Sequence, residues 1–140
     1  MVQELLRSIG ISIGVSPGQK LIIWQGDTVR MHVGFDYKGP PLTGLTLRCS
    51  IGQRRTIWPY DFDEIAYGRA TINLDQSFDF RPYTAYADID TSPISPGANY
   101  DIEAKIEEYM AETLVSIDNV IDVIGAPEFQ NFEISSYEKV

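Results

Sequence analysis

The sequence has 140 residues, 44% hydrophobic and 22% charged, which is typical of one globular domain and argues against a disordered chain. Its 20 acidic residues outnumber 11 basic ones, and the net charge of −9 argues against a nucleic-acid binder and against docking on anionic lipid. One cysteine and one histidine exclude an internal disulfide and a multi-Cys or His-rich metal site, and no apolar run approaches the ~18 residues of a membrane helix.

The chain opens on a short segment, residues 1–8, that we expect to form an N-terminal arm. It carries an acid and no long apolar stretch, so we expect no signal peptide and synthesis in the cytoplasm. Alternation of apolar and polar residues begins directly afterwards and predicts a strand over 9–15, followed by a turn at Ser16-Pro17-Gly18.

The next three segments also read as strands. A short apolar run extends from Leu21 to Trp24, and Trp24 is expected in the core. After a turn at Gly26-Asp27, alternation from Val29 to Tyr37 predicts a long half-buried strand. The alternation from Leu45 to Ile51 predicts another, with Cys49 on its inner face.

The alternation disappears from Gln53 to Gly68, which predicts a 16-residue irregular connection of the kind that often carries function. Its side chains are of types enriched in protein interfaces, and its aromatic rings could also stack on sugars. The candidate binding residues are Arg54, Arg55, Trp58, Tyr60, Phe62 and Tyr67. Alternatively, Trp58, Phe62 and Ile65 cap the open end of the core.

The same connection contains three carboxylates, Asp61, Asp63 and Glu64, which could converge on Ca²⁺. The spacing and the glycine of an EF-hand are missing, so we interpret them as a solvated acidic loop and expect no metal and no cofactor.

Alternation returns over Ala70–Leu74 and again over Ala85–Ile89. A second aromatic group lies in the crossover between them and is expected to be partly core: Phe78, Phe80, Tyr83 and Tyr86. A strand from Tyr100 to about Glu107 is favoured over a helix at 101–114, and the last strand, within 114–124, carries a bulge near Asp118-Asn119 or is covered on both faces.

The run from Ser95 to Ala104 resembles the tyrosine corner of immunoglobulin-like domains, in which a tyrosine hydroxyl bonds to the backbone a few residues upstream. The resemblance implies an all-β fold, an immunoglobulin-like or fibronectin-III-like antiparallel β-sandwich of seven to eight strands over 9–125. Ile102 stands where antibody domains have their second cysteine, so the sandwich is disulfide-free. The same topology implies cross-strand ion pairs of Arg30 with the strand of Asp88 and Asp90, and of Arg48 with the strand of Glu103 and Glu107.

We expect no enzyme. The only nucleophile–base pair of note is Cys49 with His32, and their phases place one inward and the other outward, on strands that the resemblance assigns to different sheets. Motifs such as GxSxG, the P-loop and HExxH are missing from the sequence.

The last segment, 126–140, is too apolar for a simple linker because it holds Phe129, Phe132, Ile134 and Tyr137. It is expected to add a strand, dock on a partner or lie over the domain. We therefore predict a non-enzymatic structural or interaction module that docks on protein partners or on copies of itself through its terminal arms and the 53–68 loop. Its expected setting is a virion (phage tail or capsid accessory) or another assembled surface structure. The alternative is a carbohydrate-binding module that uses the 58–67 aromatics.

Overall fold

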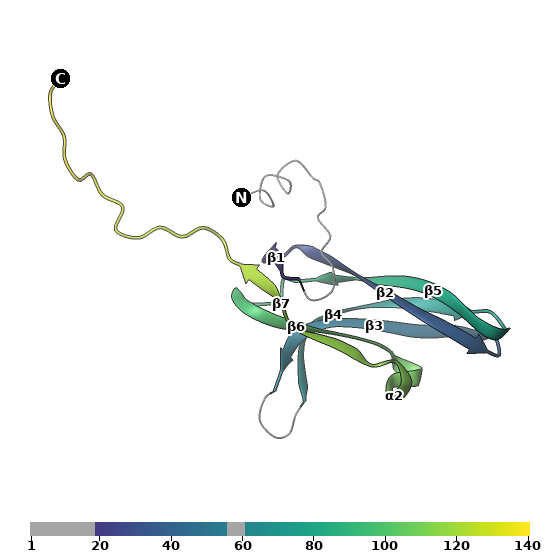
Figure 1. The fold of residues 1–140 in the computed structure, drawn as a ribbon. Helices are drawn as coiled ribbons and strands as arrows, with labels where there is room; N and C mark the ends of the chain where they lie inside the picture. The colour runs from purple at the N-terminus through teal and green to yellow at the C-terminus, as the bar shows by residue number, and fades with distance from the viewer. Residues whose placement is uncertain (1–18, 56–60) are drawn as a thin grey trace.

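The computed structural model describes residues 19–55 and 61–140, and over these ranges the fold is all-β (Figure 1). The expected arm at 1–8 and the expected strand at 9–15 lie outside the described residues. The strands are β1 (Leu21–Trp24), β2 (Thr28–Gly39), β3 (Leu42–Arg54), β4 (Phe62–Leu74), β5 (Ser77–Asp90), β6 (Gly97–Ile106) and β7 (Val115–Ile124). A short helical segment, η1 (Glu107–Tyr109) with α2 (Met110–Thr113), joins β6 to β7.

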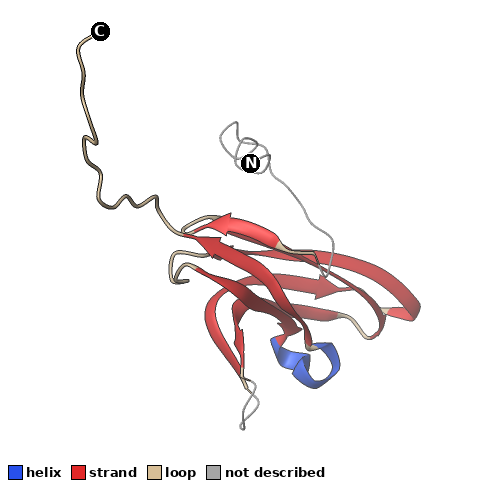
Figure 2. Cartoon of the chain, turned by 60° about the vertical axis from the view of Figure 1, so that its left-hand side comes forward, coloured by secondary structure: helices blue, strands red, loops and turns tan. Residues whose placement is uncertain are grey.

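The seven strands form two sheets (Figure 2). A curled five-stranded sheet has the order β1-β7-β6-β3-β4, and a two-stranded sheet pairs β2 with β5. Only β1 and β7 run parallel, while the other neighbouring strands are antiparallel. The sequence expectation of an all-β protein with about seven strands is thereby confirmed.

The core fills the space between the two sheets. Leu47, Cys49 and Ile51 of β3 are almost fully buried and face Ala87 and Ile89 of β5. Burying one such aliphatic side chain stabilises the fold by about 1.5–3 kcal/mol, so this row contributes much of the stability. The apolar side chains predicted to face inward on β2, β3 and β6 are buried or half-buried.

The tyrosine corner is present. The Tyr100 hydroxyl donates to the Ser95 carbonyl oxygen at 2.6 Å. A Cβ atom at Gly97 would lie 3.2 Å from that hydroxyl oxygen, so a small residue suits the position. This contact fixes the turn that leads from β5 into β6.

The strand expected from Tyr100 to about Glu107 is also confirmed, since β6 ends at Ile106. The helix-forming residues after it form only one short turn, which Thr113 ties back to β6 because its hydroxyl oxygen accepts from the Ile106 amide at 2.9 Å. The bulge expected near Asp118-Asn119 is present: the β6–β7 register shifts there, and Asn119 has a φ of 58°.

A buried carboxylate holds that bulge. Asp101 accepts from the backbone amides of Asn119 and Arg54, each at 2.7 Å, and so ties the bulge of β7 to the end of β3. A carboxylate with two backbone donors is well satisfied despite its burial.

The prediction of an irregular connection over 53–68 is wrong, because strands occupy both ends of that range. β3 continues to Arg54 and β4 begins at Phe62, with Arg54 paired to Phe62 and Gln53 to Asp63. The register shifts between Ile51 and Gly52, which leaves Ile65 as an extra residue of β4. The bulge puts the two halves of β4 out of phase, which hides the alternation from a reading of the sequence.

The second aromatic group lies on β5 and not in a crossover, which corrects the expectation. Phe78 is 90% and Phe80 64% exposed, and Tyr86 is exposed as well, so these three are not core. Tyr83 is half-buried and stacks on Phe35 with ring centroids 5.7 Å apart. Alternation along β5 directs its even-numbered aromatics to the outer face.

The two sheets touch on one side and separate on the other. At β4, a Cβ atom on Gly68 would lie only 2.0 Å from the Asp88 carbonyl oxygen of β5, so glycine allows the two backbones to meet. On the opposite side, β2 pairs with β5 alone among the described strands, and its outer edge carries no further strand.

Candidate interaction surfaces

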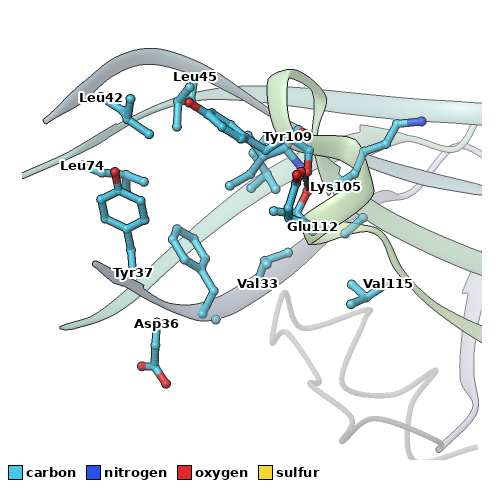
Figure 3. Close-up of a pocket in the computed structure, with 16 residues that line it drawn as sticks. Val33, Asp36, Tyr37, Leu42, Leu45, Leu74, Lys105, Tyr109, Glu112 and Val115 are labelled. Atoms are coloured by element: carbon cyan, nitrogen blue, oxygen red, sulfur yellow. Dashed lines mark hydrogen bonds between the residues drawn. The ribbon is translucent and has the colours of Figure 1, made fainter. Parts of the chain in front are cut away.

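An apolar groove opens where the two sheets separate, at the end of the molecule that carries α2 (Figure 3). Its volume is about 410 Å³. β2 supplies Val33 and Phe35, β3 supplies Leu45, and Tyr109 and Val115 stand at the rim. The groove follows from the strand count, because two strands spaced about 4.8 Å apart cannot cover a five-stranded sheet.

The groove has few polar features. Asp36, Lys105 and Glu112 are the charged residues among those that line it. Side chains that pack on one another form the base of the groove. Leu45, Leu74 and Ile106 make a separate buried cluster there, against Phe35 and Tyr37. An apolar groove beside a strand edge that carries no partner in the described part of the chain suits an extended apolar peptide.

The C-terminal tail, which we define as residues 125–140, runs away from the body of the molecule in both views (Figures 1 and 2). It adds no strand to its own domain and does not lie over it. Its large apolar side chains are 86–95% exposed: Phe129, Phe132, Ile134 and Tyr137. Of the three sequence expectations for this segment, an added strand and packing over the domain are not seen, and docking on a partner stays a prediction.

The candidate residues of the 53–68 segment are paired within the domain where they are described; Trp58 and Tyr60 lie outside the described residues. Arg54 Nε donates to Asp118 at 3.1 Å, and its guanidinium lies 5.7 Å from the Phe62 ring centroid. Arg55 Nε donates to Asp63 at 2.9 Å.

Tyr67 projects from the outer face of β4 and is half exposed. The Arg48 guanidinium lies 3.8 Å from its ring centroid and covers one face of the ring. A stacking ligand would therefore meet at most one free face of Tyr67.

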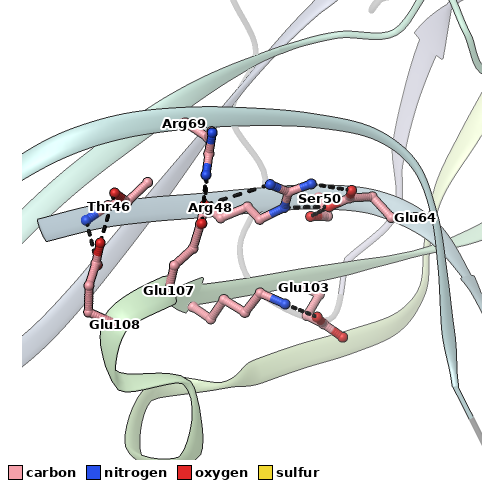
Figure 4. Close-up of polar contacts among 9 residues, drawn as sticks. Thr46, Arg48, Ser50, Glu64, Arg69, Glu103, Glu107 and Glu108 are labelled. Atoms are coloured by element: carbon pink, nitrogen blue, oxygen red, sulfur yellow. Dashed lines mark hydrogen bonds and ion pairs between the residues drawn. The ribbon is translucent and has the colours of Figure 1, made fainter.

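Arg48 also centres an ion-pair network on the outer face of the five-stranded sheet (Figure 4). It makes a two-pronged contact with Glu64, at 2.9 and 2.5 Å, and lies 3.6 Å from Glu107. Arg69 makes a similar contact with Glu107, at 2.7 and 2.6 Å. The hydrogen bonds from Arg48 hold the pKa of Glu64 below its usual value, and those from Arg69 lower the pKa of Glu107.

The expected pairing of Arg48 with Glu107 is confirmed, whereas Glu103 turns to Lys105 at 3.7 Å. The sequence does not indicate Glu64 as the main partner of Arg48, because it predicts an irregular loop at the start of β4. The expected pair between β2 and β5 is present: Arg30 contacts both carboxylate oxygens of Asp88, at 2.8 and 3.1 Å, and lowers its pKa.

The structure does not bring Cys49 and His32 together. Cys49 is fully buried in β3, and burial raises the pKa of its thiol to about 11, which leaves it protonated and unreactive. His32 lies on the other sheet, on an exposed position of β2. The two side chains expected to be separated are separated.

The acidic residues of the 61–64 segment face cations of the protein itself. Asp63 pairs with Arg55 and Glu64 with Arg48. Within residues 19–55 and 61–140, no group of three or more His, Cys, Asp or Glu side chains could hold a metal ion. Over the same ranges no helix has the length and apolar character needed to cross a membrane.

The comparisons with known proteins give little. No family model matches the chain, and no curated protein matches its sequence. Among solved structures, the chain is similar to a family 123 glycoside hydrolase from Clostridium perfringens, studied for glycolipid glycan hydrolysis, at 14% identity and a TM-score of 0.45. The match covers 89% of this chain and 25% of the hydrolase chain, so it spans about a quarter of that protein. A likeness at this score supports no statement about activity.

Proposed function

We propose that the protein is a non-enzymatic assembly subunit that binds other protein subunits through its C-terminal tail. The observation that carries the proposal is the exposure, by 86–95%, of four large apolar side chains within residues 129–137. Burying such a side chain is worth about 1.5–3 kcal/mol, so their burial at an interface would provide a strong driving force. Large apolar side chains gathered in one short exposed segment are a feature of interaction sites.

The rest of the molecule supports a binding role over a chemical one. The single thiol is buried and protonated, and the histidine stands on the other sheet. The aromatics at 58–67 are a weaker basis for sugar binding, since Arg48 covers one face of Tyr67. Docking through the N-terminal arm and the 53–68 segment, and a virion or surface-structure setting, stay predictions from the sequence.

The immunoglobulin-like resemblance is likewise part of the proposal. It is supported by the hydrogen bond of the tyrosine corner and by two sheets packed face to face around a core with a buried, unpaired cysteine. Modules of this architecture present loops, edges and arms for binding on a rigid scaffold.

Solution mass tests the proposal. Light scattering over a range of concentrations would compare the full chain with a chain that ends at Gly125. We expect the full chain to form a defined oligomer and the shortened chain to be a folded monomer, because the tail contacts nothing in its own domain. The melting temperature of the full chain should rise with concentration, since association stabilises the folded state, whereas that of the shortened chain should not. Equal monomer masses for both chains over the whole range would contradict the proposal.

A further inference from the structure

We propose that the tail of one copy binds a second copy, where it adds as a strand along the free edge of β2 and places Phe132 and Ile134 in the groove. The inference rests on the proposed function and names the partner and the surface it uses. The chain thus carries both halves of the contact, an apolar donor segment and an apolar acceptor groove.

The acceptor half is an edge strand beside an unfilled space. β2 has 12 residues and pairs only with β5 among the described strands. An edge strand presents unpaired backbone amides and carbonyls that another extended chain can satisfy. The groove of about 410 Å³ lies directly inside this edge and is lined on that side by Val33, Phe35 and Tyr37.

The donor half has the pattern of a strand. In an extended chain Phe132 and Ile134 project to the same side, whereas Glu133 projects to the other. The segment from Phe132 to Val140 contains no proline and no glycine. Asn131, with a φ of 52°, turns the backbone just before it and marks where the strand-forming segment begins.

The reach of the tail favours a second copy over the same chain. The groove rim at Val115 and the end of β7 at Ile124 are nine residues apart along one strand, roughly 30 Å at most because the strand bulges at Asn119. Eight residues lead from Ile124 to Phe132 and span roughly 29 Å at most when fully extended. Asn131 interrupts that extension, so the chain's own tail is too short to seat both apolar side chains beyond the rim.

The direction of the tail agrees. It leaves the molecule at the end of β7, whereas α2 lies at the other end of that strand (Figure 1). The groove is at the α2 end too, since residues of α2 and the first residue of β7 line it. A donor at one end and an acceptor at the other make a head-to-tail contact between identical chains.

A disulfide trap tests the contact in the full chain. One variant carries Val115→Cys at the groove rim, a position that is 59% exposed, and a second carries Ile134→Cys in the tail. The native Cys49 is fully buried and does not compete. Mixed and mildly oxidised, the two variants are expected to form a cross-linked heterodimer.

The matched control is Glu133→Cys, one residue away and on the opposite side of the strand. We expect it to cross-link to Val115→Cys roughly tenfold less than Ile134→Cys does, because alternate residues of a strand face apart. A chain that carries both Val115→Cys and Ile134→Cys should give a ladder of oligomers. A monomer with an internal disulfide would overturn the inference, since it would place the tail in its own groove.

A second variant gives an independent readout. Val115→Asp places a charge at the groove rim and is expected to weaken association roughly tenfold. Its melting temperature should be unchanged at a dilution where both chains are monomers. If the full chain assembles but neither the trap nor Val115→Asp responds, the inference falls and the proposed function stands. If the full chain never assembles, both fall.

Discussion

The two long sides of this sandwich differ in how the sheets meet. On the β4–β5 side, Gly68 lets the backbones touch, and nothing larger than a hydrogen fits between them. On the β2 side, the five-stranded sheet extends beyond the two-stranded one and leaves an apolar groove under an edge of β2 that has no partner strand within residues 19–55 and 61–140. The closed side contributes to stability, whereas the other side leaves apolar surface in the groove accessible for binding.

The largest effect is expected where the closed side is broken. Gly68→Ala would place a Cβ atom 2.0 Å from the Asp88 carbonyl oxygen, so one of the two strands must move. We expect a loss of about 3 kcal/mol in the free energy of unfolding, measured by urea denaturation.

The matched control lies on the open side. A Cβ atom at Gly34 of β2 would have its nearest neighbour at 3.9 Å, so Gly34→Ala should change stability by less than about 1 kcal/mol. Equal effects at the two positions would contradict the contrast between the sides.

A smaller effect is expected at the tyrosine corner, which holds the turn between the two sheets. Tyr100→Phe removes the hydroxyl and leaves the Ser95 carbonyl without its donor. We expect a loss of about 1–1.5 kcal/mol, measured by denaturant unfolding. Tyr86→Phe on an exposed position of β5 is the control and should be close to neutral.

The smallest effect concerns the ion pairs of the outer face. The pKa of Glu64 is lowered in the folded protein, so its ionised form stabilises the fold. This contribution is complete above the ordinary carboxyl pKa of 4.5 and is lost as the pH falls through the lower folded value. Glu64→Gln should cost about 1 kcal/mol at pH 7 and flatten the decline in stability below pH 4.5.

The control for this prediction is the more exposed pair of Arg30 and Asp88. Asp88→Asn should change stability at pH 7 by less than Glu64→Gln does, because solvent screens exposed charges. Thermal melts of both variants between pH 3 and pH 7 would check the order. A larger loss for Asp88→Asn would contradict the assignment of the main contribution to Glu64.

Much of the fold could be predicted because alternation of apolar and polar residues in a short segment is enough to indicate a strand. The alternation in β2, β3 and β6, the contact of Tyr100 and the partner of Arg30 all depend on short stretches of sequence or on one pairing. Only the second part of β4, from Ala70 to Leu74, is predicted from the sequence, because the extra residue Ile65 reverses the phase near the start of the strand. The groove could not be predicted, since it depends on which strands end up without a neighbour, a property of the whole sheet order.

The tail and the groove lie at opposite ends of the molecule, and this has a consequence for how an assembly of copies would lengthen. If each copy gives its tail to the next, the assembly has a direction: one terminus offers an empty groove and the other an unused tail. The two termini would then require different partners to stop elongation, a peptide that fills the groove at one and an acceptor surface that takes up the tail at the other. Unless the successive rotation closes a ring, length would be set by those terminators and not by the subunit itself.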